Sequence, residues 1–373
     1  MDTKDKDFEF ASPGVMMPDS TMSPLLIEND TVNGYATQSV GADDGLVVLP
    51  GQKPKKAPTP LQESLRRLRR DKRAMVSLGM IILFILIPIF GPVIYQHIGA
   101  TYNSPFFGKI GPNLYHNPFH QELDRQDELF SGQYWLGTDS IGRDLLARLM
   151  QGMLVSITVA LLVEVVDVVL GVTVGVLAGF YGGWIDQVLA RFTDIMFAFP
   201  GLLFAILLTG IFGTEADTAF ANIPLIGANG NARLILVSMA LAFTAWPLMA
   251  RYVRGQTLQL KEQQFVEAAR TSGTSDYKII MRHIIPNLSS IVVVAATLDI
   301  SGTIIGEAGL SLLGLGVQAP GSSIGLMISD ASSSLETHPW EVLLPSLVLT
   351  ILVLAFSFLG DGLRDAFDPR SKD

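Results

Sequence analysis

The chain has 373 residues, of which 49% are hydrophobic and only 16% are charged, and its mean hydropathy is +0.39. These values exclude disorder along most of the chain, and they leave more apolar surface than one soluble core can bury. The absence of cysteine excludes disulfides and thiolate sites, and the net charge of −9 argues against nucleic-acid binding, which requires a basic face.

Residues 1–60 are rich in Pro, Asp, Ser, Gly and Lys without sustained apolar periodicity, so we expect a disordered cytoplasmic tail there. The next segment places Leu61, Leu65 and Leu68 at helical spacing between arginines. This pattern predicts a basic helix that contacts the headgroups of the lipid bilayer. We expect residues 61–148 to contain this basic helix, the first span and an outer loop. A five-helix core over residues 149–365 and a C-terminal tail over residues 366–373 follow.

Six apolar segments are long enough to cross a bilayer as helices, because roughly 20 residues span its hydrocarbon core. They cover residues 74–95, 151–180, 189–212, 234–253, 288–313 and 342–363. The sequence therefore predicts an all-α membrane protein with six transmembrane helices. In the second span, Gly171, Gly175 and Gly179 recur every four residues, which predicts close helix packing, and we assign that packing to the contact within a pair of membrane subunits.

The distribution of Lys and Arg orients the chain, because cytoplasmic loops collect these residues. Eleven precede Ala74, six lie in the loop 251–287 and three follow the last span, whereas the expected outer loops 213–232 and 314–341 contain none. The long outer loop 96–150 contains four, but long loops follow the rule weakly. Both termini are therefore expected in the cytoplasm.

The loop 255–287 has the pattern of two short amphipathic helices on either side of Gly273, where a positive φ costs little. Thr274 or Ser275 can cap the second helix. The residues expected on one apolar face are Phe265, Ala268 and Ala269 in the first helix, and Tyr277, Ile280, Met281 and Ile284 in the second. The pattern alone leaves open whether this face packs on the protein's own helices or on a partner.

Three motifs together resemble those of permease subunits of ATP-binding-cassette (ABC) importers, in the branch for dipeptides, oligopeptides and nickel. The loop motif runs from Glu267-Ala268-Ala269 through Gly273 to His283 and Ile285-Pro286. It resembles the family pattern E-A-A-x3-G-x9-I-x-L-P, with His283 at the isoleucine position. The segments LGTDSIGRD (136–144) and LGDGLRDAFDPR (359–370) are similar to elements of the second permease subunit of oligopeptide importers. The resemblance covers roughly residues 60–370.

This resemblance implies a type I ABC importer permease fold in the inner or plasma membrane of a prokaryote. It implies an ATPase-coupling hairpin that contains Glu267, Ala268, Ala269, Gly273, His283 and Pro286. The implied partners are a second homologous permease subunit, two cytoplasmic ATP-binding subunits and an extracytoplasmic peptide-binding protein. Peptide import would then proceed by alternating access, with ATP and Mg²⁺ bound by the partner ATPase subunits.

The sequence contains no phosphate loop of the form GxxxxGK[ST], no HExxH or comparable zinc spacing and no GxSxG motif. We therefore expect no enzyme activity, no cofactor and no metal site in this chain. The alternatives are a permease for nickel or another small solute, an ATPase-independent secondary transporter or channel, and a membrane-embedded hydrolase. The polar hairpin argues against an independent transporter, and the lack of a catalytic set argues against a hydrolase.

Carboxylates at membrane depth are functional candidates, because each is costly to insert. Glu164 and Asp167 lie three residues apart in the second span, and Asp299 lies in the fifth. They form a possible translocation path: either they face the pore and attract the ammonium end of a peptide, or they pair with Arg or Lys of the partner permease. Asp194 and Glu307 match positions of the family, and we expect structural contacts there.

Overall fold

The computed structural model describes residues 60–222 and 232–368, and every structural statement below concerns this part of the chain. The disordered tail expected over residues 1–60 lies outside it except for Pro60, and so does most of the C-terminal tail. Within the described residues, the prediction of six membrane-crossing helices is confirmed. These are α2 (Lys72–Tyr95), α4 (Leu145–Tyr181), α6 (Gly201–Ala219), α7 (Arg233–Leu260), α10 (Ile285–Leu312) and α12 (Trp340–Phe367).

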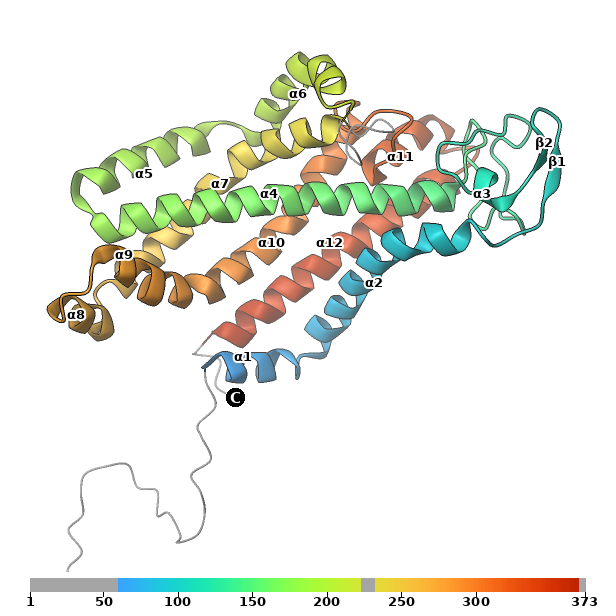
Figure 1. Ribbon diagram of the computed structural model, residues 1–373. Coiled ribbons are helices and arrows are strands. Elements are labelled where there is room, and N and C mark those ends of the chain that lie inside the picture. Colours follow the sequence, from blue (N-terminus) through green and yellow to red (C-terminus); the bar gives the residue numbers. More distant parts are fainter. Residues whose placement is uncertain (1–59, 223–231, 369–373) are drawn as a thin grey trace, which may run out of the picture. The chain divides into compact units, whose positions relative to one another are not determined.

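The shorter elements lie at the two ends of these helices (Figure 1). One end, called the loop end below, carries the antiparallel strands β1 (Tyr102–Ser104) and β2 (Gly108–Ile110), α3 (Pro112–Tyr115), α11 (Ile324–Ala331) and the 3₁₀ turn η3 (Ser332–Ser334). The other, called the hairpin end, carries α1 (Pro60–Leu68), α8 (Gln264–Thr271) and α9 (Asp276–Ile279). A π-helical turn, η2 (Ile280–Ile284), joins α9 to α10.

The prediction of one helix over residues 189–212 is wrong, because the chain forms α5 (Gly183–Ala198) and α6 with a break between them. Pro200 has no N–H to donate, and its ring disfavours helical backbone at the residue before it. Phe199 accordingly takes an extended conformation, with ψ 127°. α5 is tied to α7, because Arg254 donates to Asp186 at 2.5 and 2.8 Å, and these bonds hold the pKa of Asp186 below its ordinary value.

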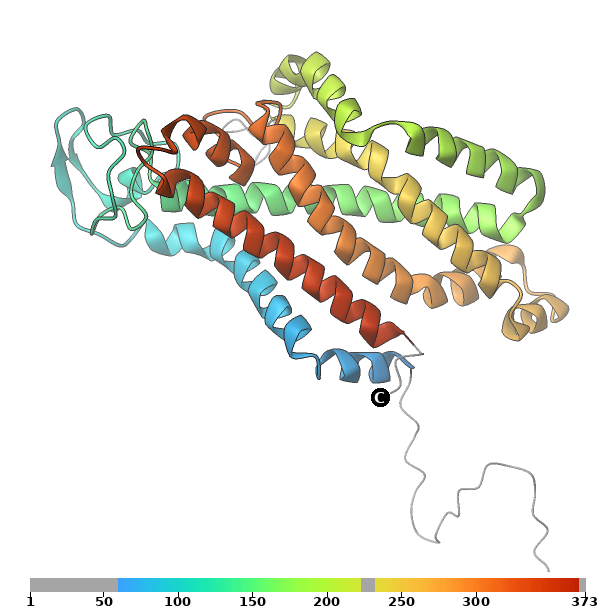
Figure 2. The ribbon, with the colours of Figure 1, turned by 180° about the vertical axis from the view of Figure 1, so that it is seen from behind.

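The core is built around α4, which has 37 residues. At a rise of about 1.5 Å per residue it is about 55 Å long, so it extends beyond a hydrocarbon core of about 30 Å at both ends. One buried apolar cluster joins α4 to α2, α10, α11 and α12, and another joins it to α6 and α7. Figure 2 shows α12 between α2 and α10, in agreement with its contacts to both.

The glycine series of α4 faces α7 of the same chain, so the assignment of its packing to a pair of permease subunits is wrong. A Cβ atom on Gly175 would lie 2.6 Å from the carbonyl oxygen of Ala250, and one on Gly179 would lie 2.7 Å from the Cβ of Thr257. The two backbones can approach this closely only because these positions lack side chains.

We predict that Gly175→Ala lowers the thermal unfolding temperature of the purified chain, because overpacking a helix contact costs about 1–3 kcal/mol. Gly255→Ala is the matched control in α7, since a Cβ there meets nothing within 4 Å. This control should leave the unfolding temperature unchanged or raise it, because alanine favours the helix over glycine. Equal unfolding temperatures for the two variants would contradict the close contact.

Candidate functional site

The hairpin formed by α8 and α9 is fixed to the membrane helices by buried side chains. Val266, Ile279 and Ile284 are each 0% exposed, and they belong to one apolar cluster with Phe180 of α4 and with residues of α7. The guanidinium of Arg270 lies over the Phe180 ring, 5.2 Å from its centroid. A displacement of the hairpin must therefore act directly on the ends of α4 and α7.

The opposite side of the hairpin presents large apolar side chains to the surroundings. Phe265 is 41% exposed, Tyr277 70% and Met281 47%. The single apolar face expected from the sequence is therefore wrong. The hairpin has an inner face that packs on its own helices and an outer face, formed by Phe265, Tyr277 and Met281, that no described residue covers.

The π-helical turn explains why the expected face is divided. In η2 the N–H of Ile285 donates to the carbonyl of Ile280, five residues back instead of four. Ile279 and Ile284, also five residues apart, consequently both face the core. Pro286 follows directly and has no N–H to continue the α-helical pattern. The spacing rule applied to the sequence assumed regular α-helix and could not detect this turn.

Gly273 forms the turn of the hairpin, as predicted. Its φ is +74°, its N–H donates to the carbonyl of Arg270 at 2.9 Å, and the N–H of Thr274 donates to the carbonyl of Ala269 at 3.1 Å. This pair of bonds is the Schellman ending of a helix. Ser275 occupies the N-cap position of α9, but its side chain makes no capping hydrogen bond, so the expected side-chain cap is wrong.

The remaining motif residues lie around this turn. Glu267 and Ala268 are exposed on α8. His283 is half-buried, and its ring centroid lies 6.2 Å from that of Phe265, across the hairpin. The side-chain amide of Asn287 donates to the His283 carbonyl at 2.7 Å. The motif residues are thus brought together on one small body that has a rigid inner face and an exposed outer face.

Three membrane carboxylates form a cluster between two helices. Glu164 and Asp167 of α4 and Asp299 of α10 have carboxylate oxygens within 4.8 Å of one another. Glu164 is 7% exposed and Asp167 2% exposed. Within the described residues, both oxygens of Glu164 and one oxygen of each of the other two accept no hydrogen bond. These carboxyl oxygens therefore remain without a hydrogen-bond partner from this part of the chain.

The cluster borders a cavity of about 790 Å³ between α4, α7, α10 and α12. Asp167 and Asp299 line this cavity, together with apolar residues of α7 and α10. The other polar or charged residues of the lining are Tyr252, Gln256, Ser290, Arg364 and Asp368. A solute with a positive group fits the carboxylate side of this cavity, and the arginine supplies the opposite sign.

Asp194 and Glu307 have intrachain partners, as expected. Asp194 accepts from Arg251 at 2.8 Å in an exposed pair. Glu307 is 1% exposed and accepts hydrogen bonds from the hydroxyls of Ser156 and Ser311, both at 2.7 Å. Neither residue belongs to the lining of the 790 Å³ cavity.

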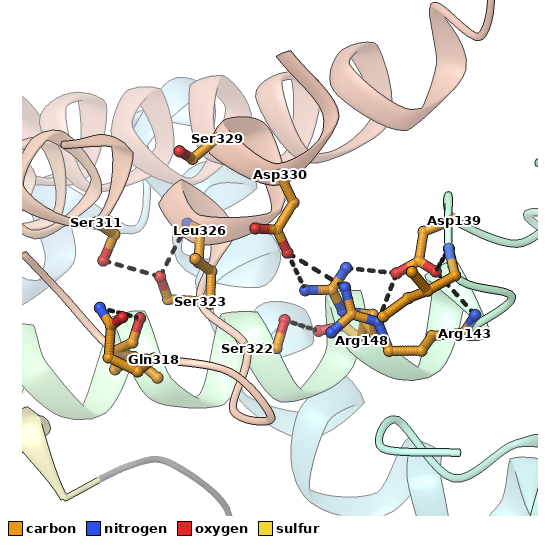
Figure 3. Close-up of polar contacts among 12 residues, drawn as sticks. Asp139, Arg143, Arg148, Ser311, Gln318, Ser322, Ser323, Leu326, Ser329 and Asp330 are labelled. Carbon is orange, nitrogen blue, oxygen red and sulfur yellow. Dashed lines mark hydrogen bonds and ion pairs between the residues drawn. The ribbon is translucent and has the colours of Figure 1, made fainter. Parts of the chain in front are cut away.

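At the loop end, two arginines and two aspartates form a clamp (Figure 3). Asp139 accepts from Arg143 and Arg148, both at 2.7 Å. Asp330 of α11 accepts from Arg148 at 2.9 Å and from Arg143 at 3.2 Å. Below, these four residues are called the clamp. The clamp connects the loop before α4 with α4 itself and with α11. The sequence alone does not reveal the role of Asp330, because this residue lies some 180 residues from its partners.

Buried polar residues also hold the interior of this loop. Asp144 caps α4 and lies 2.6 Å from the Nδ1 of His116, with both side chains buried. Burial opposes ionisation of Glu122, but its hydrogen bonds with Ser104 and His120 outweigh that effect and hold the pKa of this carboxyl below its ordinary value. The loop is therefore an ordered part of the protein, held by specific polar contacts.

Comparison with known families gave two matches. Residues 171–373 match the family described as binding-protein-dependent transport system inner membrane component. Residues 59–107 match the N-terminal TM domain of oligopeptide transport permease C.

The chain is also similar to individual proteins. The glutathione transport system permease protein GsiD of Escherichia coli O6:K15:H31 (strain 536 / UPEC) is 37% identical over 327 residues, which cover 88% of this chain and 96% of that protein. GsiD of Shigella boydii serotype 4 (strain Sb227) matches to the same extent. Among solved structures, an inward-facing MetNI methionine ABC transporter covers 59% of this chain and 96% of its own, at 18% identity and a TM-score of 0.46.

We predict that Arg148→Met destabilises the protein by about 3–5 kcal/mol, because it leaves Asp139 buried with one partner fewer. The change is measured as a lower thermal unfolding temperature of the purified chain. Arg191→Met in α5 is the control, since Arg191 is exposed. A stability loss no greater than in this control would show that the clamp does not hold the loop end together.

Proposed function

The chain belongs to the family of binding-protein-dependent transport system inner membrane components, and from that premise we propose that it is the second permease subunit of an ATP-driven peptide importer. It is a multi-pass inner membrane protein with the six-helix fold of a type I ABC importer permease. The observation that carries the proposal is 37% identity over 96% of a glutathione transport permease, because glutathione is itself a short peptide. The match to oligopeptide transport permease C over residues 59–107 agrees with it.

In the proposed assembly, this chain pairs with a second homologous permease subunit. Two cytoplasmic ATP-binding subunits hold ATP and Mg²⁺, and an extracytoplasmic binding protein delivers the peptide. The hairpin end faces the cytoplasm, supported by the 20 Lys and Arg residues that lie before the first span, in the loop 251–287 and after the last span. This chain itself would hydrolyse no nucleotide.

The hairpin is the proposed contact with an ATP-binding subunit. Its outer face of Phe265, Tyr277 and Met281 exposes the kind of apolar surface that marks a protein interface. Glu267 adds a charge to this surface. Because the inner face is packed against α4 and α7, closure of the ATP-binding subunits on the hairpin would move the ends of these helices and open the cavity to alternate sides of the membrane.

The cluster of Glu164, Asp167 and Asp299 is the proposed attraction site for the ammonium end of the peptide. Its support is the unpartnered carboxylate oxygens and the position of Asp167 and Asp299 on the cavity wall. Arg364 on the same wall would attract the carboxylate end. Pairing with Arg or Lys of the partner permease is the alternative role of this cluster, and the variants below separate the two.

The function is tested with the complete complex in proteoliposomes. ATP-dependent uptake of labelled glutathione or a dipeptide is expected, and uptake of nickel without peptide uptake would favour the alternative of a nickel permease.

In this assay Gly273→Asp should keep the complex assembled and hydrolysing ATP but lose most peptide uptake per ATP. Aspartate tolerates a positive φ and a Cβ meets nothing within 4 Å there, so the turn survives while a charge enters the docking surface.

Gly108→Asp is the matched control for that variant. Gly108 also has a positive φ, of +69°, and open space around it, but it lies at the loop end. Its uptake per ATP should equal that of the wild type. Normal uptake in Gly273→Asp would remove the hairpin from the coupling mechanism.

A second prediction concerns the carboxylate cluster. The wild type should transport a dipeptide faster than its N-acetylated form, which has no ammonium group, and Glu164→Gln should reduce this preference about tenfold. Glu215→Gln, an exposed carboxylate of α6, is the control. If Glu164→Gln slows both substrates equally, recognition of the ammonium group is wrong and pairing with the partner permease is favoured.

A further inference from the structure

A different group of ligand-type side chains lies at the loop end, and no step of the transport proposal uses it. Asp127 belongs to the loop before α4, Glu341 lies in the first turn of α12, and His338 lies two residues before that helix begins. One ligand atom from each of the three lies within 4.8 Å of the other two. The sequence alone does not reveal this group, because Asp127 lies more than 200 residues from His338 and Glu341.

Glu341 is buried without a partner. It is 1% exposed, and neither of its carboxylate oxygens accepts a hydrogen bond from the described residues. Oδ1 of Asp127 also accepts none, and its nearest basic atom is Nδ1 of His338 at 3.8 Å. Buried carboxylates are normally satisfied by hydrogen bonds, by counter-ions or by metal ions. The described part of the chain therefore supplies no partner for the side chain of Glu341.

The neighbouring arginines donate no hydrogen bond to Glu341. Arg143 and Arg148 direct their charged hydrogen bonds to Asp139 and Asp330, the two aspartates of the clamp (Figure 3). Nε of Arg148 remains without an acceptor, yet no hydrogen bond joins it to Glu341. In this part of the chain, two arginines thus face four carboxylates, and Asp127 and Glu341 are the two that accept no hydrogen bond from either arginine.

The backbone holds the three ligands in place from two directions. Asp127 has a positive φ of 51°, and its N–H donates to the carbonyl of Asp139 at 3.1 Å, so it is tied to the clamp. The N–H of Glu341 donates to the carbonyl of His338 at 3.2 Å in the first turn of α12. The group therefore bridges two separate structural elements.

We propose that Asp127, His338 and Glu341 bind a divalent transition-metal ion such as Zn²⁺, which links the loop to α12. One imidazole with two carboxylates suits zinc and its neighbours, whereas Ca²⁺ and Mg²⁺ favour oxygen ligands alone. Bonds of about 2.0–2.2 Å place tetrahedral ligand atoms about 3.4 Å apart. The side chains of His338 and Asp127 are 30% and 28% exposed, so a rotation of these two side chains would be needed to bring the atoms to that separation. A fourth position is left for water.

The test uses the full chain purified in its complex, stripped with a chelator and titrated with ZnCl₂ by calorimetry. One Zn²⁺ per chain should bind, and Glu341→Gln and His338→Asn should each weaken binding at least tenfold. The matched controls are Glu336→Gln and His97→Asn, an exposed carboxylate and an exposed imidazole outside the group, and they should bind as the wild type does. Zinc should raise the unfolding temperature of the wild type but not that of Glu341→Gln.

Two further measurements keep a negative result interpretable. Without metal, Glu341→Gln should unfold at the wild-type temperature or above it, because it removes a buried carboxyl that accepts no hydrogen bond from the described residues. Lost binding in this variant then does not reflect misfolding. Glu164→Gln tests whether zinc binds instead at the carboxylate cluster between α4 and α10. If Glu164→Gln loses zinc binding and Glu341→Gln keeps it, the proposal is overturned. The proposal would also be overturned if the wild type bound zinc no more tightly than Glu341→Gln does. That result is expected if Glu341 shares a proton with Asp127 instead of binding a metal ion.

Discussion

The close contact between α4 and α7 sets the positions of both functional regions. Along this contact, Gly171, Gly175 and Gly179 lie directly against the backbone and side chains of α7. The wall of the 790 Å³ cavity contains Asp167 of α4 and a series of α7 residues, so its width depends on the same separation. The α8–α9 hairpin continues from α7 and packs on Phe180 at the far end of α4. A rigid contact between the two helices therefore connects hairpin and cavity mechanically.

Hydrogen-bond partners separate two kinds of carboxylate in this protein. Glu307 and Asp139 are almost completely buried, and hydroxyl or guanidinium groups of the same chain satisfy them. Glu164 and Glu341 are also buried, yet they accept no hydrogen bond from the described residues. A satisfied carboxylate holds helices or loops together, whereas an unsatisfied one is free to accept a partner from outside the chain. The unsatisfied ones lie beside the cavity and at the loop end, which are the places where we propose ligands.

Two differences between the sequence-based expectations and the structure have local causes. The third span was expected as one helix because its hydropathy is continuous, but Pro200 removes a donor and restricts Phe199, so the helix breaks. The hairpin was expected to have one apolar face because the spacing rule assumes 3.6 residues per turn. The π-helical turn before Pro286 shifts Ile284 inward and leaves Tyr277 and Met281 outward. Apolar periodicity reports burial, but it does not report a local change of helix type.

The sequence by itself determined the six apolar spans, the distribution of basic residues and the turn at Gly273, because each depends on neighbouring residues and on the physics of one helix in lipid. It also marked Glu164 and Asp167 as neighbours on one helix face. Only the tertiary structure brought Asp299 to that pair, Asp330 to Arg148, and Asp127 to His338 and Glu341. These residues come from helices and loops far apart in the chain. Their proximity depends on how helices pack, and a single sequence contains no local signal for that packing.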